Sequence, residues 1–140
     1  MKMSRGLRNN NPGNIRLGSF KYKGERAKSS DVAFRQFESM EWGYRAMFVL
    51  LHTYALRYDC RTLRDIISRY APSSENNTEA YIRRVAGMIH LTDDEQLDTL
   101  DRRVMVDVVS AMSAVENGRE ADLASVVAGW ELFCADFARK

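Results

Sequence analysis

The fold is decided near the start of the chain, by a polar, turn-forming stretch that reads Asn9-Asn10-Asn11-Pro12-Gly13-Asn14-Ile15-Arg16. Asparagine tolerates the left-handed backbone region and bonds its own main chain, proline fixes φ, and glycine permits a positive φ. The stretch therefore predicts a rigid loop that displays several amide groups. Such a loop suits the recognition of a neutral polar ligand such as a sugar N-acetyl group. The alternative is a turn that only starts a hairpin.

The composition is that of an ordinary globular protein, with 140 residues of which 45% are hydrophobic and 29% charged. This length suits one domain, residues 1–140, with a sizeable core. The net charge is only +2, but residues 1–28 combine a single acid, Glu25, with many basic residues, beginning at Lys2. This basic segment could meet nucleic acid, an anionic membrane or the acidic bacterial cell wall. The alternative is a solvated charged surface.

Several classes of function lack their sequence signatures. His52 and His90 are the only histidines and have no metal-ligand spacing, so we expect neither a metal nor a cofactor. Cys60 and Cys134 follow no metal or redox spacing, and no disulfide is inferred between them. The sequence begins without the apolar core of a secretion signal and contains nothing near the roughly 20 apolar residues of a membrane span. Acid–base chemistry by carboxylates remains.

Apolar spacing and capping residues predict a mainly helical (α+β) fold with a small N-terminal β-hairpin. Residues 15–37 suggest two short strands around a turn at Lys23-Gly24. Ser39 is the expected N-cap of a helix over 40–57, with an apolar face at Trp42, Ala46, Val49, Leu50 and Thr53. Thr62-x-x-Asp65 is expected to open a helix that ends at Ala71-Pro72, and Asn77 or Thr78 is expected to cap the next helix. A Thr92–Glu95 capping box is expected to open a brief turn. Two further helices are expected, one from Thr99 or Leu100 to Glu116 that Asn117-Gly118 stops, and one over 122–137.

Glu116 is the best-placed acid. It follows Met112 by four residues, which puts it on the apolar face of its helix at the C-terminal end. Partial burial and the negative end of the helix dipole both raise the pKa of a carboxyl group, as a general acid near neutral pH requires. The alternative is a frayed terminal glutamate beside an Asn-Gly turn.

Other side chains could complete a site. Glu75, in a polar loop before Tyr81, is a rival acid, or else an exposed residue that supports the N-cap of the next helix. Glu25 or Asp31 could supply the second carboxylate of an inverting glycosidase, although Asp31 also suits fixing a turn. We expect stacking surfaces and amide contacts for sugar rings from Tyr22, Trp42, Tyr70, Tyr81, Asn11, Asn14 and Asn77, with Trp42 alternatively in the core.

The sequence resembles a family of small phage and prophage proteins that are described as virion structural proteins or lysozyme-like muralytic factors. The segments that carry the resemblance, in order along most of the chain, are 5–16, Asp31-x-x-Phe34-x-x-Phe37, Trp42-Gly43-Tyr44-Arg45-Ala46, Tyr70-Ala71-Pro72, Glu75-Asn76-Asn77-Thr78-x-x-Tyr81 and Glu116-Asn117-Gly118.

The resemblance implies a lysozyme-like helical domain that cleaves the glycan strands of peptidoglycan, as a lysozyme, glucosaminidase or lytic transglycosylase does. Glu116 would be the general acid, because such enzymes place it at a helix C-terminus. In the bacterial glucosaminidases the glutamate helix comes before the Asn-rich loop and the tyrosine segment, so the order here suggests a circularly permuted fold.

A phage origin would also explain where the protein is made and where it acts. It would be made in the bacterial cytoplasm without a signal peptide and reach the cell wall in a virion or through a holin-made hole. Its partners would be peptidoglycan and phage virion or tail proteins. The alternatives are a non-catalytic virion or tail protein that binds wall glycan, and, last, a small basic nucleic-acid binder, which lacks a recognition motif.

Overall fold

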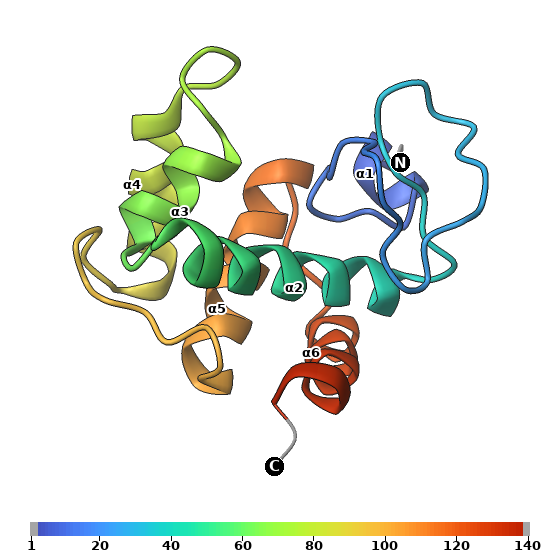
Figure 1. Cartoon of the computed structure of the whole chain (residues 1–140). Coiled ribbons are helices and arrows are strands. Elements are labelled where there is room, and N and C mark those ends of the chain that lie inside the picture. The colour runs from blue at the N-terminus through green and yellow to red at the C-terminus, as the bar shows by residue number, and fades with distance from the viewer. Residues whose placement is uncertain (1–2, 139–140) are drawn as a thin grey trace.

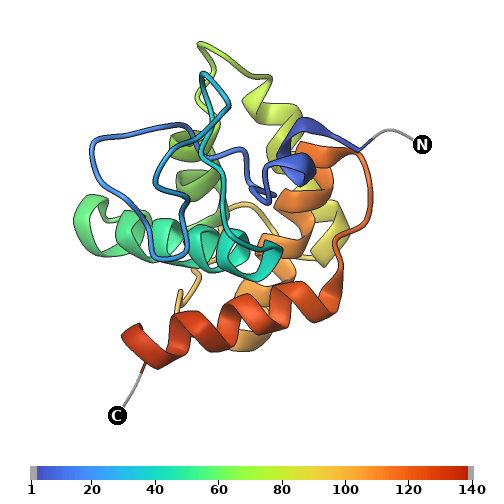
Figure 2. The same ribbon diagram turned by 90° about the vertical axis from the view of Figure 1, so that its right-hand side faces the viewer.

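The computed structural model describes residues 3–138, and within that range the protein is mainly helical (Figure 1). The helices are α1 (Arg5–Arg8), α2 (Met40–Tyr58), α3 (Leu63–Tyr70), α4 (Thr78–Ile89), α5 (Arg102–Asn117) and α6 (Leu123–Phe137). The long helix α2 runs through the middle of the molecule, with α6 packed extensively against it. The helices α3 and α4 lie near one end of α2, and the long loop after α1 lies near the other (Figures 1 and 2).

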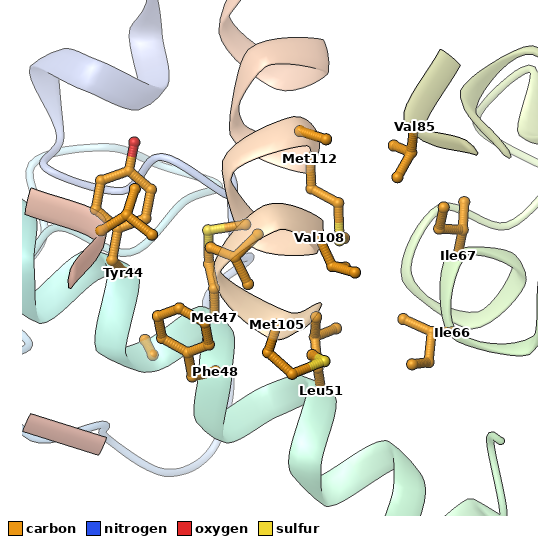
Figure 3. Packing of buried hydrophobic residues seen from close by; sticks show 14 of the residues in the cluster. Tyr44, Met47, Phe48, Leu51, Ile66, Ile67, Val85, Met105, Val108 and Met112 are labelled. Atoms are coloured by element: carbon orange, nitrogen blue, oxygen red, sulfur yellow. The ribbon is translucent and has the colours of Figure 1, made fainter. Parts of the chain in front are cut away.

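The buried side chains of these helices form one continuous cluster, which Figure 3 shows from close by. The middle of α5 lies at its centre, where Met105, Val108 and Met112 are fully buried. These side chains lie between those of α2, such as Leu51, and those of α3 and α4 (Figure 3). Spacings of three and four residues bring the α5 side chains onto one face, as the sequence predicts. This packing fixes the helix whose last turn carries Glu116.

Local capping chemistry fixes several of the helix ends where the sequence predicts them. The Thr62 hydroxyl accepts a hydrogen bond from the amide of Asp65, and the Asp65 carboxylate accepts one from the amide of Thr62, so the capping box of α3 is complete. The Asn77 side chain caps α4 by accepting from the amide of Ala80. Gly118 ends α5 in the left-handed region, at a φ of 69°.

One predicted helix start is wrong, and one correctly predicted N-cap position lacks a side-chain hydrogen bond. The helix α5 begins at Arg102, not at Thr99 or Leu100, because Asp101 caps it by accepting from the amide of Arg103. Ser39 stands at the N-cap position of α2, but its side chain makes no capping hydrogen bond. At the predicted brief turn, the amide of Glu95 bonds the carbonyl of Thr92 at 3.3 Å, and no helix follows.

The predicted hairpin is also wrong in its detail, because residues 15–37 form an irregular loop in place of two strands. Its arms meet in isolated antiparallel bridges, Arg16 to Phe34 and Glu25 to Phe37. Buried Arg35 takes the place of a regular ladder, since its guanidinium donates to the carbonyls of Arg16 and Phe20 and to Glu25. A loop held by a side chain need not follow the period-two pattern of a strand.

The apolar face predicted for α2 is only partly the buried one. Tyr44, Met47, Phe48 and Leu51 bury the opposite side more deeply, because α2 packs against both α5 and α6. The predicted stripe that continues through Val49, Leu50 and Thr53 instead borders a surface hollow described below. Gly43 lets the N-terminal loop lie directly on α2, since a Cβ there would collide with the carbonyl oxygen of Asn10.

The histidines and cysteines occupy separate places in the fold. His52 is buried and its Nδ1 lies 2.8 Å from the hydroxyl of Thr99, while His90 ends α4 in the left-handed region. Cys60 and Cys134 are both free thiols. Over residues 3–138 no cluster of three potential metal ligands is found, and no helix there has the length and apolarity to cross a membrane.

Candidate functional site

The last turn of α5 brings Glu116 against the N-terminal loop and α4. One carboxylate oxygen accepts a hydrogen bond from the Asn14 side-chain amide at 2.8 Å, and the other accepts one from the Tyr81 hydroxyl at 3.0 Å. Both donors are neutral, and they come from residues 102 and 35 positions away. The carboxyl group is therefore held in place without a compensating positive charge.

Burial raises the pKa of Glu116 above its usual range, although the hydrogen bonds from Asn14 and Tyr81 act in the opposite direction. Its place at the C-terminal end of α5, where unpaired helix carbonyls gather, also disfavours negative charge. Burial and the charge of Glu116 raise the pKa of Tyr81, which keeps the phenol protonated as a donor. The Glu116 carboxyl group can thus stay protonated at a higher pH than a glutamate side chain in water does.

The residue after Glu116 fastens the N-terminal loop to α5. The Asn117 amide donates to the carbonyl of Pro12 at 2.8 Å, and its oxygen accepts from the hydroxyl of Ser4 at 2.6 Å. Tyr70, from α3, donates to the carbonyl of Gly13 at 2.5 Å. The left-handed backbone of Asn14, with a φ of 50°, then aims its side chain at Glu116.

Asn11 has a different role from the one that the sequence suggested. Its side chain is fully buried, donates to the carbonyls of Ile15 and Arg35, and accepts from the amide of Ile15. All of its polar atoms are used within the loop, so in this structure none is displayed to a ligand. Asn11 builds the loop, while Asn14 faces the carboxyl group. The asparagine run is therefore divided between scaffold and site.

Glu116 lines an open hollow of about 500 Å³, which we call the acid groove. The groove lies between the N-terminal loops, α2 and the segment after α3. Its walls are formed by Gly13, Asn14, Ile15, Arg16, Phe20, Tyr22, Phe34, Arg35, Leu50, Tyr54, Tyr70, Ala71, Pro72, Glu75, Asn76 and Glu116. Apolar and aromatic walls with a few polar groups are typical of ligand sites.

The rival acid Glu75 lies on the same groove but in a different environment. It is exposed, and one of its oxygens pairs with the Arg16 guanidinium at 3.0 Å, from the opposite loop. An exposed pair of this kind is weak and leaves both side chains mobile. The structure therefore brings both predicted catalytic glutamates to one groove, and only Glu116 is desolvated there.

Asp31 and Glu25 are both committed to the loop. The Asp31 carboxylate accepts from the guanidinium of Arg5 and from the amides of Ala33 and Phe34, which hold its pKa well below the usual range. It fixes a turn, the alternative that the sequence left open. Glu25 is buried against Arg35, with the shortest N–O distance at 2.5 Å. Neither residue lines the acid groove among the described residues.

The aromatic and amide candidates divide in a similar way. Tyr22 is largely buried, yet lines the groove beside Phe20, and Tyr70 lines it as well. Tyr81 supports Glu116 from α4, outside the lining of the groove, and Asn77 is occupied as the cap of α4. The partly buried ring of Trp42 packs against the core.

Sequence reasoning missed two contributors, Asn117 and Tyr54. Asn117 was interpreted only as a helix stop, and nothing local shows that its amide fastens a loop 105 residues away. Tyr54 follows Leu50 by four residues on α2, so the helical spacing could have found it as a second wall residue.

Part of the basic N-terminal segment forms ion pairs within the protein. Lys21 and Lys23 each form an ion pair with an acid, at 3.4 and 2.9 Å, as do Arg5 and Arg16. Lys2 lies outside the described residues. Arg8, Arg26 and Lys28 form no ion pair with a described residue, so part of the positive charge of this segment stays unpaired.

No family model matches the chain. A comparison with curated proteins finds 39% identity over 118 residues to Protein P5 of Pseudoalteromonas phage PM2, covering 82% of this chain and 72% of that protein.

Proposed function

Because this chain belongs to the family of Protein P5 of Pseudoalteromonas phage PM2, we propose that it acts for a phage, as an enzyme that cleaves the glycan strands of peptidoglycan. The observation that carries the proposal is Glu116, a desolvated carboxyl group with a raised pKa that lines the acid groove. We further propose a lysozyme-like fold relationship for the helical domain.

In the proposed reaction Glu116 is the general acid. A protonated carboxyl group at the wall of the groove donates its proton to the glycosidic oxygen as the bond to the sugar carbon breaks, so that the leaving hydroxyl departs neutral. Correctly placed general acids contribute about 10²–10⁴-fold to a rate. The phenols and apolar side chains of the groove supply stacking surfaces for the sugar rings.

The side chain of Asn14 suits both protonation states of Glu116. Its NH₂ group donates to the carboxylate, and its oxygen is buried without a hydrogen-bond partner among the described residues. Turning the amide over would present that oxygen to a carboxyl proton in place of the NH₂ group. In our proposal Asn14 keeps the acid in one orientation while its proton is lost and regained.

Glu75 decides between two reaction types. An inverting hydrolase places its two carboxyl groups about 6.5–9.5 Å apart to leave room for a water molecule, whereas a lytic transglycosylase needs only the acid. Glu75 is the one other acid on the groove among the described residues, and Arg16 holds it in an ion pair. A hydrolase would use Glu75 to position water, and a transglycosylase would use the sugar's own hydroxyl.

A second candidate function is a phage structural protein that binds wall glycan without cleaving it. The observation that favours it is that both oxygens of Glu116 are already occupied by Asn14 and Tyr81. In either case we propose that the protein meets peptidoglycan at the cell wall, in a virion or after release through a holin-made hole. Phage virion or tail proteins are its proposed partners.

The test is the release of soluble fragments from purified sacculi. We expect the wild-type protein to release them and Glu116→Gln to reduce the rate by about 10²–10⁴-fold. Mass spectrometry of the fragments separates the reaction types, since a transglycosylase leaves a 1,6-anhydro end and a hydrolase leaves a reducing end. Glu120→Gln is the matched control, because it makes the same chemical change at an exposed position outside the acid groove.

Thermal unfolding shows whether Glu116→Gln is folded. The raised pKa means that folding favours the protonated form of Glu116, so its ionisation costs stability as the pH rises above the unfolded value. The variant should therefore gain in Tm relative to wild type as the pH rises above about 4. Loss of cleavage in Glu75→Gln but not in Glu116→Gln would overturn the assignment of the acid. Sacculus binding without any cleavage would favour the structural protein.

A further inference from the structure

A second hollow of about 790 Å³, which we call the basic arm, lies beside the acid groove. The two hollows share the side chains of Phe20, Tyr22, Leu50, Tyr54 and Pro72, so they are direct neighbours. Beyond the shared part, the basic arm runs along the C-terminal half of α2 and against α3. A ligand in the acid groove can therefore extend a branch into the basic arm.

The charged side chains that line the basic arm all carry the same sign. They are Lys21, Lys23, Arg45, Arg57 and Arg69, and no aspartate or glutamate of residues 3–138 lines it. Three of these cations have partners, since Asp136 pairs with Lys23 and Arg45 and Glu25 pairs with Lys21. Arg57 and Arg69 form no ion pair with a described residue. They are therefore the two cations of the arm that have no ion pair among residues 3–138.

Aromatic rings hold one of these two charges in place. The guanidinium of Arg69 lies 3.4 Å from the ring centroid of Tyr58 and 5.5 Å from that of Tyr54. A guanidinium stacked on a ring keeps its N–H edge available, and that edge matches a carboxylate in a two-point hydrogen bond. Arg57 projects from the same turn of α2 as these tyrosines. The outer arm is thus suited to an anion with planar oxygen pairs.

We propose that the basic arm binds the carboxylates of the stem peptide that the glycan strand carries, so that the substrate is peptide-bearing glycan. This inference rests on the proposed function. The N-acetylated sugars of an intact strand are uncharged, so a row of cations beside the acid groove has no partner on the sugars themselves. The stem peptides branch from alternate sugars and bear free carboxylates, which Arg57 and Arg69 meet while the strand occupies the acid groove.

The experiment compares two forms of one soluble glycan strand. Both have acetylated amino groups; in one the peptide carboxylates are free, and in the other they are converted to neutral methylamides. Affinity is measured by fluorescence anisotropy with Glu116→Gln protein, so that the strands stay intact. We expect the carboxylate strand to bind about tenfold more tightly, as two exposed guanidinium–carboxylate contacts would give.

Substitutions test whether Arg57 and Arg69 cause the preference for the carboxylate strand. Adding Arg57→Gln and Arg69→Gln together should reduce the affinity ratio of the two strands to near one, and Arg57→Lys with Arg69→Lys should restore part of it. Arg103→Gln is the matched control, because Arg103 is exposed at the opposite end of α5 and lines neither hollow. Both target arginines are exposed, so the circular dichroism spectrum of each variant should match that of the parent.

The outcomes separate this inference from the proposed function. Equal affinity for the two strands, with cleavage of sacculi intact, overturns the basic arm alone. A tenfold preference that depends on Arg57 and Arg69, without any cleavage, supports the arm and overturns the enzyme. If duplex DNA competes through the same arginines at least as well as the strand does, the arm is a general polyanion site and the stem-peptide assignment is wrong.

Discussion

The loop over residues 17–37 and the end of α5 each bury a glutamate, but they satisfy it in opposite ways. In the loop, Glu25 is enclosed with Arg35 as an ion pair, and both side chains are almost fully shielded from water. At the end of α5, Glu116 meets only the amide of Asn14 and the phenol of Tyr81. The first carboxylate has its charge matched, while the second has only neutral donors.

The difference separates a structural acid from one that can exchange a proton. A buried carboxylate beside a guanidinium has its charge compensated and organises the loop around it. Partial burial with only neutral donors disfavours the charged form of Glu116 and raises its pKa, which is the direction that a general acid requires. The three predictions below test this contrast, from the largest expected effect to the smallest.

Breaking the ion pair of the loop should have the largest effect on stability. Glu25→Gln leaves the Arg35 charge buried and unpaired, and we expect it to lower the free energy of unfolding by about 3–5 kcal/mol. Urea denaturation followed by circular dichroism measures this change. The double variant Glu25→Gln/Arg35→Met removes both charges and should recover part of the loss. If Glu25→Gln cost no more than an exposed substitution, Glu25 would not be the structural acid that the contrast requires.

Removing one neutral donor should have an intermediate effect, on activity and its pH dependence. Tyr81→Phe deletes a hydrogen bond to the Glu116 carboxylate, and that bond lowers the pKa. The pKa of Glu116 should therefore rise further, and the alkaline limb of the cleavage profile should move to higher pH. At the optimum we expect about a tenfold lower kcat, because the acid is less well positioned.

The matched control is Tyr70→Phe, which removes a phenol that bonds the carbonyl of Gly13 and not Glu116. It should leave the alkaline limb where it is in the wild-type protein. If the two variants gave the same pH profile, the contact between Tyr81 and Glu116 would have no part in setting the pKa of Glu116.

The smallest effect on stability is expected at the exposed acid of the groove. Glu75→Gln breaks a solvent-exposed pair with Arg16, which should change the free energy of unfolding by less than about 1 kcal/mol. Cleavage then reports the role of Glu75: a transglycosylase would keep its rate, and a hydrolase would lose it. A large loss of stability would show that Glu75 is structural, contrary to its exposure.

The sequence predicts those parts of the fold that depend on neighbours along the chain. The starts of α3 and α4, at Thr62 and Asn77, and the stop of α5 at Gly118 follow from side chains and backbone freedom within one helical turn. The loop over residues 15–37 fails as a predicted hairpin because its path depends on Arg35, whose partners are spread from residue 16 to residue 25. No periodic pattern records such a contact.

In the candidate site, too, the sequence predicts the features that depend on neighbouring residues and not the long-range contacts. Helical spacing places Glu116 at the edge of the core, and the turn chemistry of the asparagine run marks a built loop. Which asparagine faces the acid is not local information: the side chain of Asn11 is turned inward to bond Ile15, and that of Asn14 reaches across 102 residues. Glu75 reaches the same groove only because the packing of α3 places its loop opposite Arg16.

The fastening of residues 4–14 to Glu116 and Asn117 has a consequence for biosynthesis. Contacts between positions so far apart in sequence close late in folding, because the loop-closure entropy is lost before the contacts form. On a translating ribosome the N-terminal loop would wait without its partner until the last turn of α5 emerged from the exit tunnel. Glu116 and the loop that orients it would therefore come together late in folding. In a chain that is still being synthesised, the site would not yet be formed.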